Sequence, residues 1–318
     1  MLLRALTLAA ALWLAACGGG RRTVVAPPPM PAPASPAHEA KPPAEEAVAP
    51  AGTPPRVAVT PAANPLKTSP LPPWRRQTPE VRQAEEAKFE TRSYQTPAGA
   101  VLPYRLFVPG GYDPERKYPL ILVLHGASSR GHDNQLQMSD SDGPRYWASG
   151  SVQNLQQAFV VAPQADPQYA PTWVRAWRPP PAQDPKRPEP LELSVELLDE
   201  LSKEFSIDQS RLYVVGYSMG GFGAWLVTSR HPDLFAAVVP IAGGGDPSYI
   251  VGSSAKIWAF HGTTDKVVPI ARSRQMVDAL KTAGKDVKYT EYPGVNHEAW
   301  KLVYEEPELP VWLFEQSR

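Results

Sequence analysis

One serine in this chain has the neighbours that a nucleophile needs. Residues 216–220 read Gly-Tyr-Ser-Met-Gly, which matches the pattern G-x-S-x-G with Ser218 at its centre. Residues 212–215 have the apolar, β-branched and aromatic composition of a buried parallel strand, and residues 221–230 predict a helix. A strand, a tight turn and a helix would present the Ser218 hydroxyl for attack on a carbonyl carbon.

The two glycines of this pattern have a steric role. Side chains at Gly216 and Gly220 would collide where the strand and the helix pass closest to each other. The serine would then adopt a strained backbone conformation at the tip of the turn. The first turn of the helix leaves N–H groups free, and these can stabilise a developing negative charge.

A serine nucleophile needs a base, and the base needs an acid that orients it. Three histidines follow Ser218 in the chain, at positions 231, 261 and 297. His231 lies at the end of the predicted helix and is expected to cap it. His261 precedes Asp265 in the chain, which is the wrong order, because the acid comes before the histidine in this architecture. We therefore predict His297, in the loop after the last strand, as the base.

Two aspartates after predicted strands are candidates for the acid. Asp265 follows the strand next to the last one, which is the usual position of the acid, and it is our prediction. Asp246 is the alternative, although it could instead cap a helix that begins at Pro247.

Strands and helices alternate along the chain, which predicts an α/β fold with a mostly parallel sheet and helices on both faces. Further strands are predicted at 89–94, 101–108, 118–124, 158–162, 235–241, 256–260 and 287–292. Further helices are predicted at 191–205, 268–283 and 307–314.

Two loops are candidates for contact with a substrate. Residues 128–150 are polar and contain glycine, and we expect them to line the entrance of the site. Residues 163–190 are rich in proline and contain Trp173 and Trp177. These tryptophans could form an aromatic wall for the substrate or could equally cover the core.

The N-terminus, residues 1–17, reads as an export signal with a basic start and a short apolar stretch. It ends in Leu-Ala-Ala-Cys, which resembles a bacterial lipobox and predicts a lipid on Cys17, the only cysteine in the chain. Lipidation would place the protein in the cell envelope, anchored at the periplasmic face or in the outer membrane. If Cys17 carries no lipid, the protein would be secreted.

Residues 18–79 contain many prolines and alanines and few large apolar residues, so we predict a disordered linker. Residues 80–318 are long enough for one α/β domain. The linker would hold this domain away from the membrane.

The composition excludes several other classes of function. Lys and Arg balance Asp and Glu at 32 each, so net charge gives no argument for nucleic-acid binding. A single cysteine cannot form an intramolecular disulfide. No cluster of His, Asp and Glu has the spacing of metal ligands, and we expect neither a metal nor a cofactor.

These motifs resemble the α/β-hydrolase superfamily over residues 89–318, and in particular prolyl-oligopeptidase-like and dienelactone-hydrolase-like esterases. These esterases include feruloyl and acetylxylan-type esterases, polyhydroxybutyrate depolymerases and predicted peptidases. The resemblance rests on residues 216–221, on His-Gly-x-x-Asp at 261–265 with Val268-Pro269, and on His297. It implies the α/β-hydrolase fold and an α/β-hydrolase catalytic triad.

The resemblance also implies a role for each residue. Ser218 would be the nucleophile, His297 the base and Asp265 the acid, and the N–H groups of Met219 and Ala127 would form the oxyanion hole. The chain has serine where true dienelactone hydrolases have cysteine, which favours ester hydrolysis. The linker composition before residue 89 leaves no room for the propeller of a prolyl oligopeptidase.

The expected function is therefore hydrolysis of short-chain, carbohydrate-linked or aromatic carboxylic esters through an acyl-serine. A peptidase with the same triad is the first alternative, and a lipase or phospholipase is the second. A binding protein without catalysis is a third, which the complete set of serine, aspartate and histidine disfavours.

Overall fold

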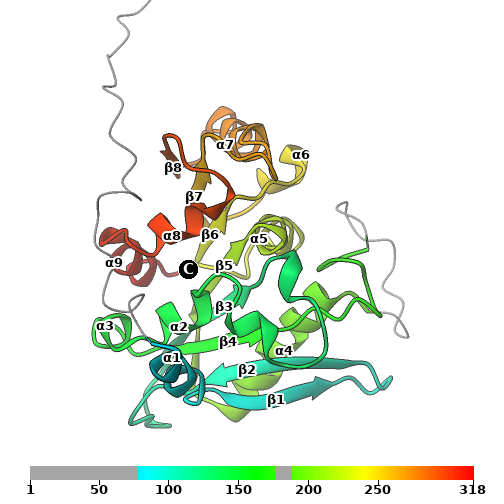
Figure 1. Cartoon of the computed structure of the whole chain (residues 1–318), viewed down its shortest axis with the longest axis vertical. Helices are drawn as coiled ribbons and strands as arrows, with labels where there is room; N and C mark the ends of the chain where they lie inside the picture. Colours follow the sequence, from blue (N-terminus) through cyan, green and yellow to red (C-terminus); the bar gives the residue numbers. More distant parts are fainter. Residues whose placement is uncertain (1–77, 176–187) are drawn as a thin grey trace, which may run out of the picture. The chain divides into compact units, whose positions relative to one another are not determined.

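The computed structural model describes residues 78–175 and 188–318, all within one compact unit. Cys17, the export signal, Trp177 and nearly all of the predicted linker lie outside the described residues. The centre of this unit is an eight-stranded sheet with the order β1-β2-β4-β3-β5-β6-β7-β8 (Figure 1). The strands are β1 (Glu90–Gln95), β2 (Val101–Phe107), β3 (Tyr118–Leu124), β4 (Phe159–Pro163), β5 (Ile207–Tyr217), β6 (Ala237–Ile241), β7 (Lys256–Gly262) and β8 (Val287–Tyr292).

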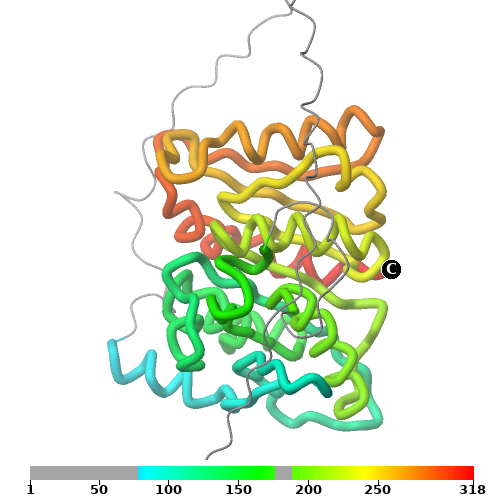
Figure 2. The backbone as a smooth tube through the Cα atoms, turned by 90° about the vertical axis from the view of Figure 1, so that its right-hand side faces the viewer, coloured from blue at the N-terminus to red at the C-terminus, as the bar shows by residue number. Residues whose placement is uncertain are grey.

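The sheet is mixed only at one edge. β1 pairs with β2 and β2 pairs with β4 in antiparallel fashion, whereas every pairing from β4 through β8 is parallel. Figure 2 shows this progression as colour bands from cyan β1–β2 to orange β8, with the red C-terminal helices returning to the middle. The predicted α/β-hydrolase architecture is therefore confirmed, and β1 and β2 form an antiparallel hairpin at one edge of the sheet.

Alternating residues of the central strands supply two separate cores. All seven residues of β3 are buried, and they point in turn to opposite faces of the sheet. Leu120, Leu122 and Leu124 belong to one apolar cluster, whereas Ile121 and Val123 belong to the other. A strand that is buried on both faces requires helices on both faces, which explains the continuous apolar run in the sequence.

The helices divide between these two faces. The first cluster contains buried residues of α4 (Pro190–Glu204), α5 (Met219–Arg230), α6 (Pro247–Ile250) and α7 (Ala271–Thr282). The second contains buried residues of α2 (Gly143–Trp147), α3 (Gly150–Gln153), α8 (Trp300–Val303) and α9 (Glu308–Phe314). The remaining helical elements are α1 (Pro79–Glu86) and the short 3-10 turns η3 (Ala127–Ser129), η4 (Leu136–Met138) and η5 (His297–Ala299).

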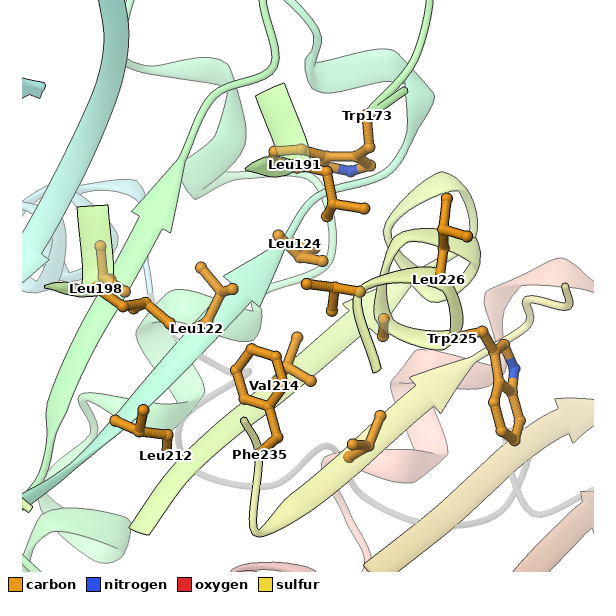
Figure 3. Packing of buried hydrophobic residues seen from close by; sticks show 14 of the residues in the cluster. Leu122, Leu124, Trp173, Leu191, Leu198, Leu212, Val214, Trp225, Leu226 and Phe235 are labelled. Atoms are coloured by element: carbon orange, nitrogen blue, oxygen red, sulfur yellow. The ribbon is translucent and has the colours of Figure 1, made fainter. Parts of the chain in front are cut away.

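The first cluster packs α4 and α5 against the middle of the sheet. Leu191 and Leu198 of α4 lie over Leu122 and Leu124 of β3 (Figure 3). This packing holds α5, the helix that follows Ser218, in a fixed place against the sheet. No helix among the described residues has the length and hydrophobicity needed to cross a membrane.

The segment 128–150 differs from its prediction as a polar loop. It contains η4, α2 and the start of α3, and every residue of α2 is buried. Trp147 is fully buried, and Arg145 of the same helix is 6% exposed. The prediction was wrong because α2 is too short to show a helical period, and because its charged residue is paired rather than exposed.

Candidate active site

Ser218 lies at the turn between β5 and α5. Its φ of 54° and ψ of −117° place it in a region that residues other than glycine rarely adopt. Its N–H donates to Ile241 O at 2.8 Å, which ties the turn to the end of β6. The strained conformation projects the side chain of Ser218 beyond the carboxyl end of the sheet.

Close backbone contact requires the glycines on either side of Ser218. A Cβ at Gly216 would lie 2.0 Å from Gly220 O, and a Cβ at Gly220 would lie 2.0 Å from Leu124 O. These contacts are with backbone atoms, which cannot turn aside as a side chain can. The start of α5 therefore lies directly against the ends of β3 and β5.

The structure brings Ser218, His297 and Asp265 into one hydrogen-bonded chain. His297 Nε2 lies 2.8 Å from Ser218 Oγ, and His297 Nδ1 lies 2.7 Å from Asp265 Oδ2. Since the carboxylate accepts hydrogen bonds only, Nδ1 carries the proton and Nε2 is free to take one from the serine. The ring of Tyr217 packs against the imidazole, with 5.2 Å between the ring centroids.

The Asp265 carboxylate is fully buried and is surrounded by donors. Oδ1 accepts from the N–H groups of Val267 and Val268, each at 2.9 Å. Oδ2 accepts from His297, and His261 Nε2 lies 3.3 Å from the same oxygen. These contacts fix the orientation of the carboxylate toward His297.

His261 is a residue of the site whose role the sequence did not indicate. Its Nε2 also contacts Val268 O at 2.9 Å, so both groups near Nε2 are acceptors and this nitrogen carries the proton. Its Nδ1 lies 2.7 Å from Ser273 Oγ. Burial lowers the pKa of His261, which is consistent with a neutral imidazole that donates toward Asp265.

Loop contacts set the distance between the acid and the base. A Cβ at Gly262 would lie 2.4 Å from both Val295 O and Asn296 O. The loop after β7, which carries Asp265, therefore touches the loop after β8, which carries His297. The bond from Thr264 N to Val295 O, at 3.0 Å, closes the same contact.

The alternatives for acid and base have other contacts. The side chain of Asp246 accepts from Ser248 N at 3.0 Å and caps α6. His231 ends α5 and lies 2.9 Å from the Glu192 carboxylate. Neither side chain takes part in the hydrogen-bonded chain at Ser218.

The predicted oxyanion donors lie at matching places on adjacent parallel strands. Leu124 of β3 pairs with Gly216 of β5, and Ala127 and Met219 each come three residues later. Among the described residues, neither the Ala127 N–H nor the Met219 N–H has an acceptor. Both groups are therefore available to a developing oxyanion.

The oxyanion loop, residues 125–131, is held by hydrogen bonds to its carbonyl oxygens. Side chains donate to the carbonyls at 125, 126, 127 and 129: Trp173 Nε1 to His125 O (3.1 Å), the His125 ring to Gly126 O (2.6 Å), Arg130 Nε to Ala127 O (2.9 Å) and Gln164 Nε2 to Ser129 O (3.1 Å). This arrangement fixes the loop and leaves the Ala127 N–H unused.

The His125 side chain has a structural role. Its Nε2 accepts from Ala165 N at 3.0 Å, so its Nδ1 carries the proton that is donated to Gly126 O. Burial lowers its pKa to about 4, so the ring is neutral near pH 7. His125 anchors the loop and does not approach Ser218 as a base.

Trp173 lies in the core. It is fully buried in the first apolar cluster (Figure 3). The centroid of its ring lies 4.7 Å from that of His125. It therefore forms no exposed wall for a substrate, and it supports the oxyanion loop from beneath instead. The residues described in the structure contain no group of three or more His, Cys, Asp or Glu that could hold a metal ion.

The sequence of the chain matches one known protein family. The model of a family described as "Putative esterase" matches residues 99–300, which include Ser218, Asp265 and His297. The chain belongs to this esterase family. The match includes both candidate oxyanion donors and ends three residues after His297.

Solved and curated relatives of the family support the same classification. A thermostable esterase of known structure is 40% identical, with a TM-score of 0.67 over 74% of this chain and 64% of its own. Poly(3-hydroxyalkanoate) depolymerase C of Paucimonas lemoignei is 26% identical over 56% of this chain and 46% of its own. The bifunctional acetylxylan esterase/xylanase XynS20E of Neocallimastix patriciarum is 26% identical over 55% of this chain and 23% of its own. The chain thus spans about half or less of these two curated relatives.

Proposed function

We propose that this chain is a serine esterase that hydrolyses carboxylic esters through an acyl-serine intermediate. The observation that carries the proposal is the hydrogen-bonded chain from Ser218 Oγ through His297 to Asp265, with distances of 2.8 and 2.7 Å. Membership of the esterase family supports ester hydrolysis as the reaction.

In the acylation step, Ser218 Oγ attacks the ester carbonyl carbon, and its proton passes to His297 Nε2. The carbonyl oxygen gains the negative charge and accepts from the N–H groups of Ala127 and Met219, each worth about 3 kcal/mol of transition-state stabilisation. Asp265 stabilises the imidazolium that forms and keeps its Nδ1 protonated. The intermediate then collapses, and the alcohol leaves with the proton from His297.

Deacylation repeats these steps with water as the nucleophile. His297 takes a proton from water, hydroxide adds to the acyl carbon, and the proton returns to Ser218 Oγ as the carboxylic acid leaves. No residue beyond these five is needed for proton transfer or charge stabilisation.

For the substrate, we propose an ester of a short acyl chain, or an ester linked to a carbohydrate or an aromatic acid. The names of two curated relatives, a poly(3-hydroxyalkanoate) depolymerase and an acetylxylan esterase, support this choice of substrate. A long-chain lipid ester is the competing substrate.

The test is release of p-nitrophenol from acetate, butyrate and decanoate esters by the purified chain, with Ser218→Ala as the control. We expect activity that falls with chain length and is lost in the control. Preference for decanoate would favour a lipase. Equal rates for the folded wild-type chain and the control on all three esters would refute the esterase proposal, and peptide substrates would then be tested.

For location, we propose that Cys17 is lipidated and that residues 18–79 tether the catalytic domain, residues 80–318, to the cell envelope. The Leu-Ala-Ala-Cys sequence at 14–17 supports this proposal. Expression of wild type and Cys17→Ser in a bacterial host with labelled fatty acid tests it. Label in the wild type alone, with membrane association lost in the variant, is expected; absence of label in both would contradict it.

A further inference from the structure

The oxyanion loop is fixed from one side by a carboxylate that the mechanism does not use. Asp140 follows η4, fourteen residues after Gly126 in the sequence. Its Oδ2 accepts from Gly126 N at 2.5 Å, and its Oδ1 accepts from Ser128 Oγ at 2.6 Å. The two donors flank Ala127, so the carboxylate bridges the residues on either side of the candidate oxyanion donor.

We propose that Asp140 is a positioning residue that holds the Ala127 N–H in line with Ser218. This inference rests on the proposed function, since it concerns the oxyanion hole of the same site. Asp140 touches neither the nucleophile nor the base, and it acts through the backbone on each side of Ala127.

Arg130 holds the oxyanion loop from the opposite side. Arg130 Nε donates to Ala127 O at 2.9 Å, and its Nη1 donates to Pro171 O. The Ala127 peptide is thus held at its carbonyl by a guanidinium and at its flanking residues by a carboxylate. The Ala127 N–H belongs to the Gly126–Ala127 peptide, whose carbonyl oxygen accepts from the His125 ring at 2.6 Å. Asp140 adds a restraint on either side of this peptide, through the Gly126 N–H and the Ser128 side chain.

The geometry at Gly126 shows how closely the carboxylate is packed. A Cβ at this position would lie 2.5 Å from Asp140 Oδ2 and 3.4 Å from Tyr217 Cδ1. Gly126 is thus placed between the carboxylate and the ring beside the nucleophile. The negative charge of Asp140 would disfavour an oxyanion nearby. Its benefit to the site is that the two charge-assisted hydrogen bonds it accepts orient the loop.

Substitutions at position 140 separate orientation from charge. Asp140→Ala loses both contacts and is expected to lower kcat by about 10- to 100-fold, below the roughly 100- to 1,000-fold cost of losing an oxyanion donor altogether. KM should change by less than about threefold, because the donor acts mainly in the transition state. Asp140→Asn can still accept from Gly126 N and donate to Ser128 Oγ, so we expect it to restore most of the activity.

Two further variants keep the test decisive if Asp140→Ala does not fold. Ser128→Ala removes one contact from an exposed side chain and should lower kcat by a few fold. Asp208→Ala is a matched control, since Asp208 likewise accepts from a backbone N–H and a hydroxyl, those of Ser210, at 3.0 and 2.6 Å. Asp208 lies at the opposite end of β5, and its variant should keep the wild-type kcat/KM.

Two readouts distinguish failure of this inference from failure of the proposed function. The first is kcat and KM on p-nitrophenyl acetate, and the second is the amide ¹H shift of Gly126, which a short bond to a carboxylate moves downfield whether or not the chain is an esterase. We expect a downfield signal that is lost in Asp140→Ala and partly kept in Asp140→Asn, together with a lower kcat in Asp140→Ala. An unshifted Gly126 amide, an unchanged kcat in Asp140→Ala, or an Asp140→Asn variant as impaired as Asp140→Ala would overturn the inference. An inactive wild-type chain would instead refute the proposed function.

Discussion

The Asp265 carboxylate shows at the scale of single residues why one aspartate can serve as the acid and another cannot. Its two oxygens receive two backbone N–H groups and face two histidines, and the group is fully buried. Asp246 follows a strand at the same edge of the sheet, yet its carboxylate caps a short helix. Asp265 can serve as the acid because its loop, after β7, touches the loop after β8 that carries His297.

Replacement of each aspartate by asparagine tests this assignment. Asp265→Asn should lower kcat by about 10⁴-fold, because an amide can donate to Nδ1 and stabilise the wrong imidazole tautomer. Asp246→Asn should stay within about twofold of the wild type. The check is kcat on p-nitrophenyl acetate, and an Asp265→Asn variant with normal kcat would assign the acid elsewhere.

Sequence reasoning could select Ser218, Asp265 and His297 because the chemistry fixes their types and the fold fixes their order. It could not assign the role of His261 or find Asp140, since their contacts depend on how two loops meet. Aspartate is common in polar loops, and nothing in the local sequence of Asp140 distinguishes it from Asp133, which binds the N–H groups at the start of η4.

At the scale of elements, the elbow depends on backbone contacts that only glycine permits. Gly216 and Gly220 let α5 begin directly against β3 and β5, and this contact brings the start of α5 next to the oxyanion loop. Since backbone carbonyls cannot move without breaking the sheet, a methyl group at either position should displace the helix.

Substitution of Gly220 by alanine tests this dependence. The added Cβ would lie 2.0 Å from Leu124 O, and we expect a loss of at least about 3 kcal/mol of unfolding free energy. For a domain of this size, that lowers Tm by roughly 6 to 12 °C. Thermal unfolding followed by circular dichroism measures the change.

Gly252→Ala is the matched control, because no atom lies within 4 Å of a Cβ at that position. Its Tm should stay within about 2 °C of the wild type. Equal Tm values for Gly220→Ala and the wild type would show that the elbow tolerates a side chain and that the contact is not close in solution.

The elements that sequence predicts well are those whose burial determines their pattern. β3 and β8 match the predicted ranges at both ends, because a strand in a sheet has a clear apolar or alternating run. α2 was missed because its five residues are too few to show a period. The burial of Trp173 could not be predicted, because a buried and an exposed tryptophan in a proline-rich loop have the same sequence context.

At the scale of the whole molecule, the buried side chain of His125, which anchors the oxyanion loop, also affects stability. His125 is 2% exposed, and burial lowers its pKa to about 4, from an ordinary value near 6.5. The unfolded chain therefore binds a proton between these values while the folded chain does not. The contribution of His125 to the unfolding free energy is fully present above about pH 6.5. It falls progressively, by about 3 kcal/mol, as the pH drops toward 4.

Urea unfolding at pH 7, 5.5 and 4.5 checks the pH dependence. The wild type should lose unfolding free energy across this range, whereas His125→Gln should be less stable at pH 7 and lose less as the pH falls. Other titrating groups contribute equally to both proteins, so the comparison isolates position 125. Parallel slopes for the two proteins would contradict the assignment of a neutral, buried His125.

The central claim for the molecule is that Ser218 becomes acylated. The most direct measurement is mass spectrometry of the chain after reaction with a fluorophosphonate, which forms a stable bond to an activated serine. We predict one adduct per chain, located on the peptide that contains Ser218, and strong slowing of labelling in His297→Ala. Labelling at another residue, or the same rate in His297→Ala as in the wild type, would contradict the account.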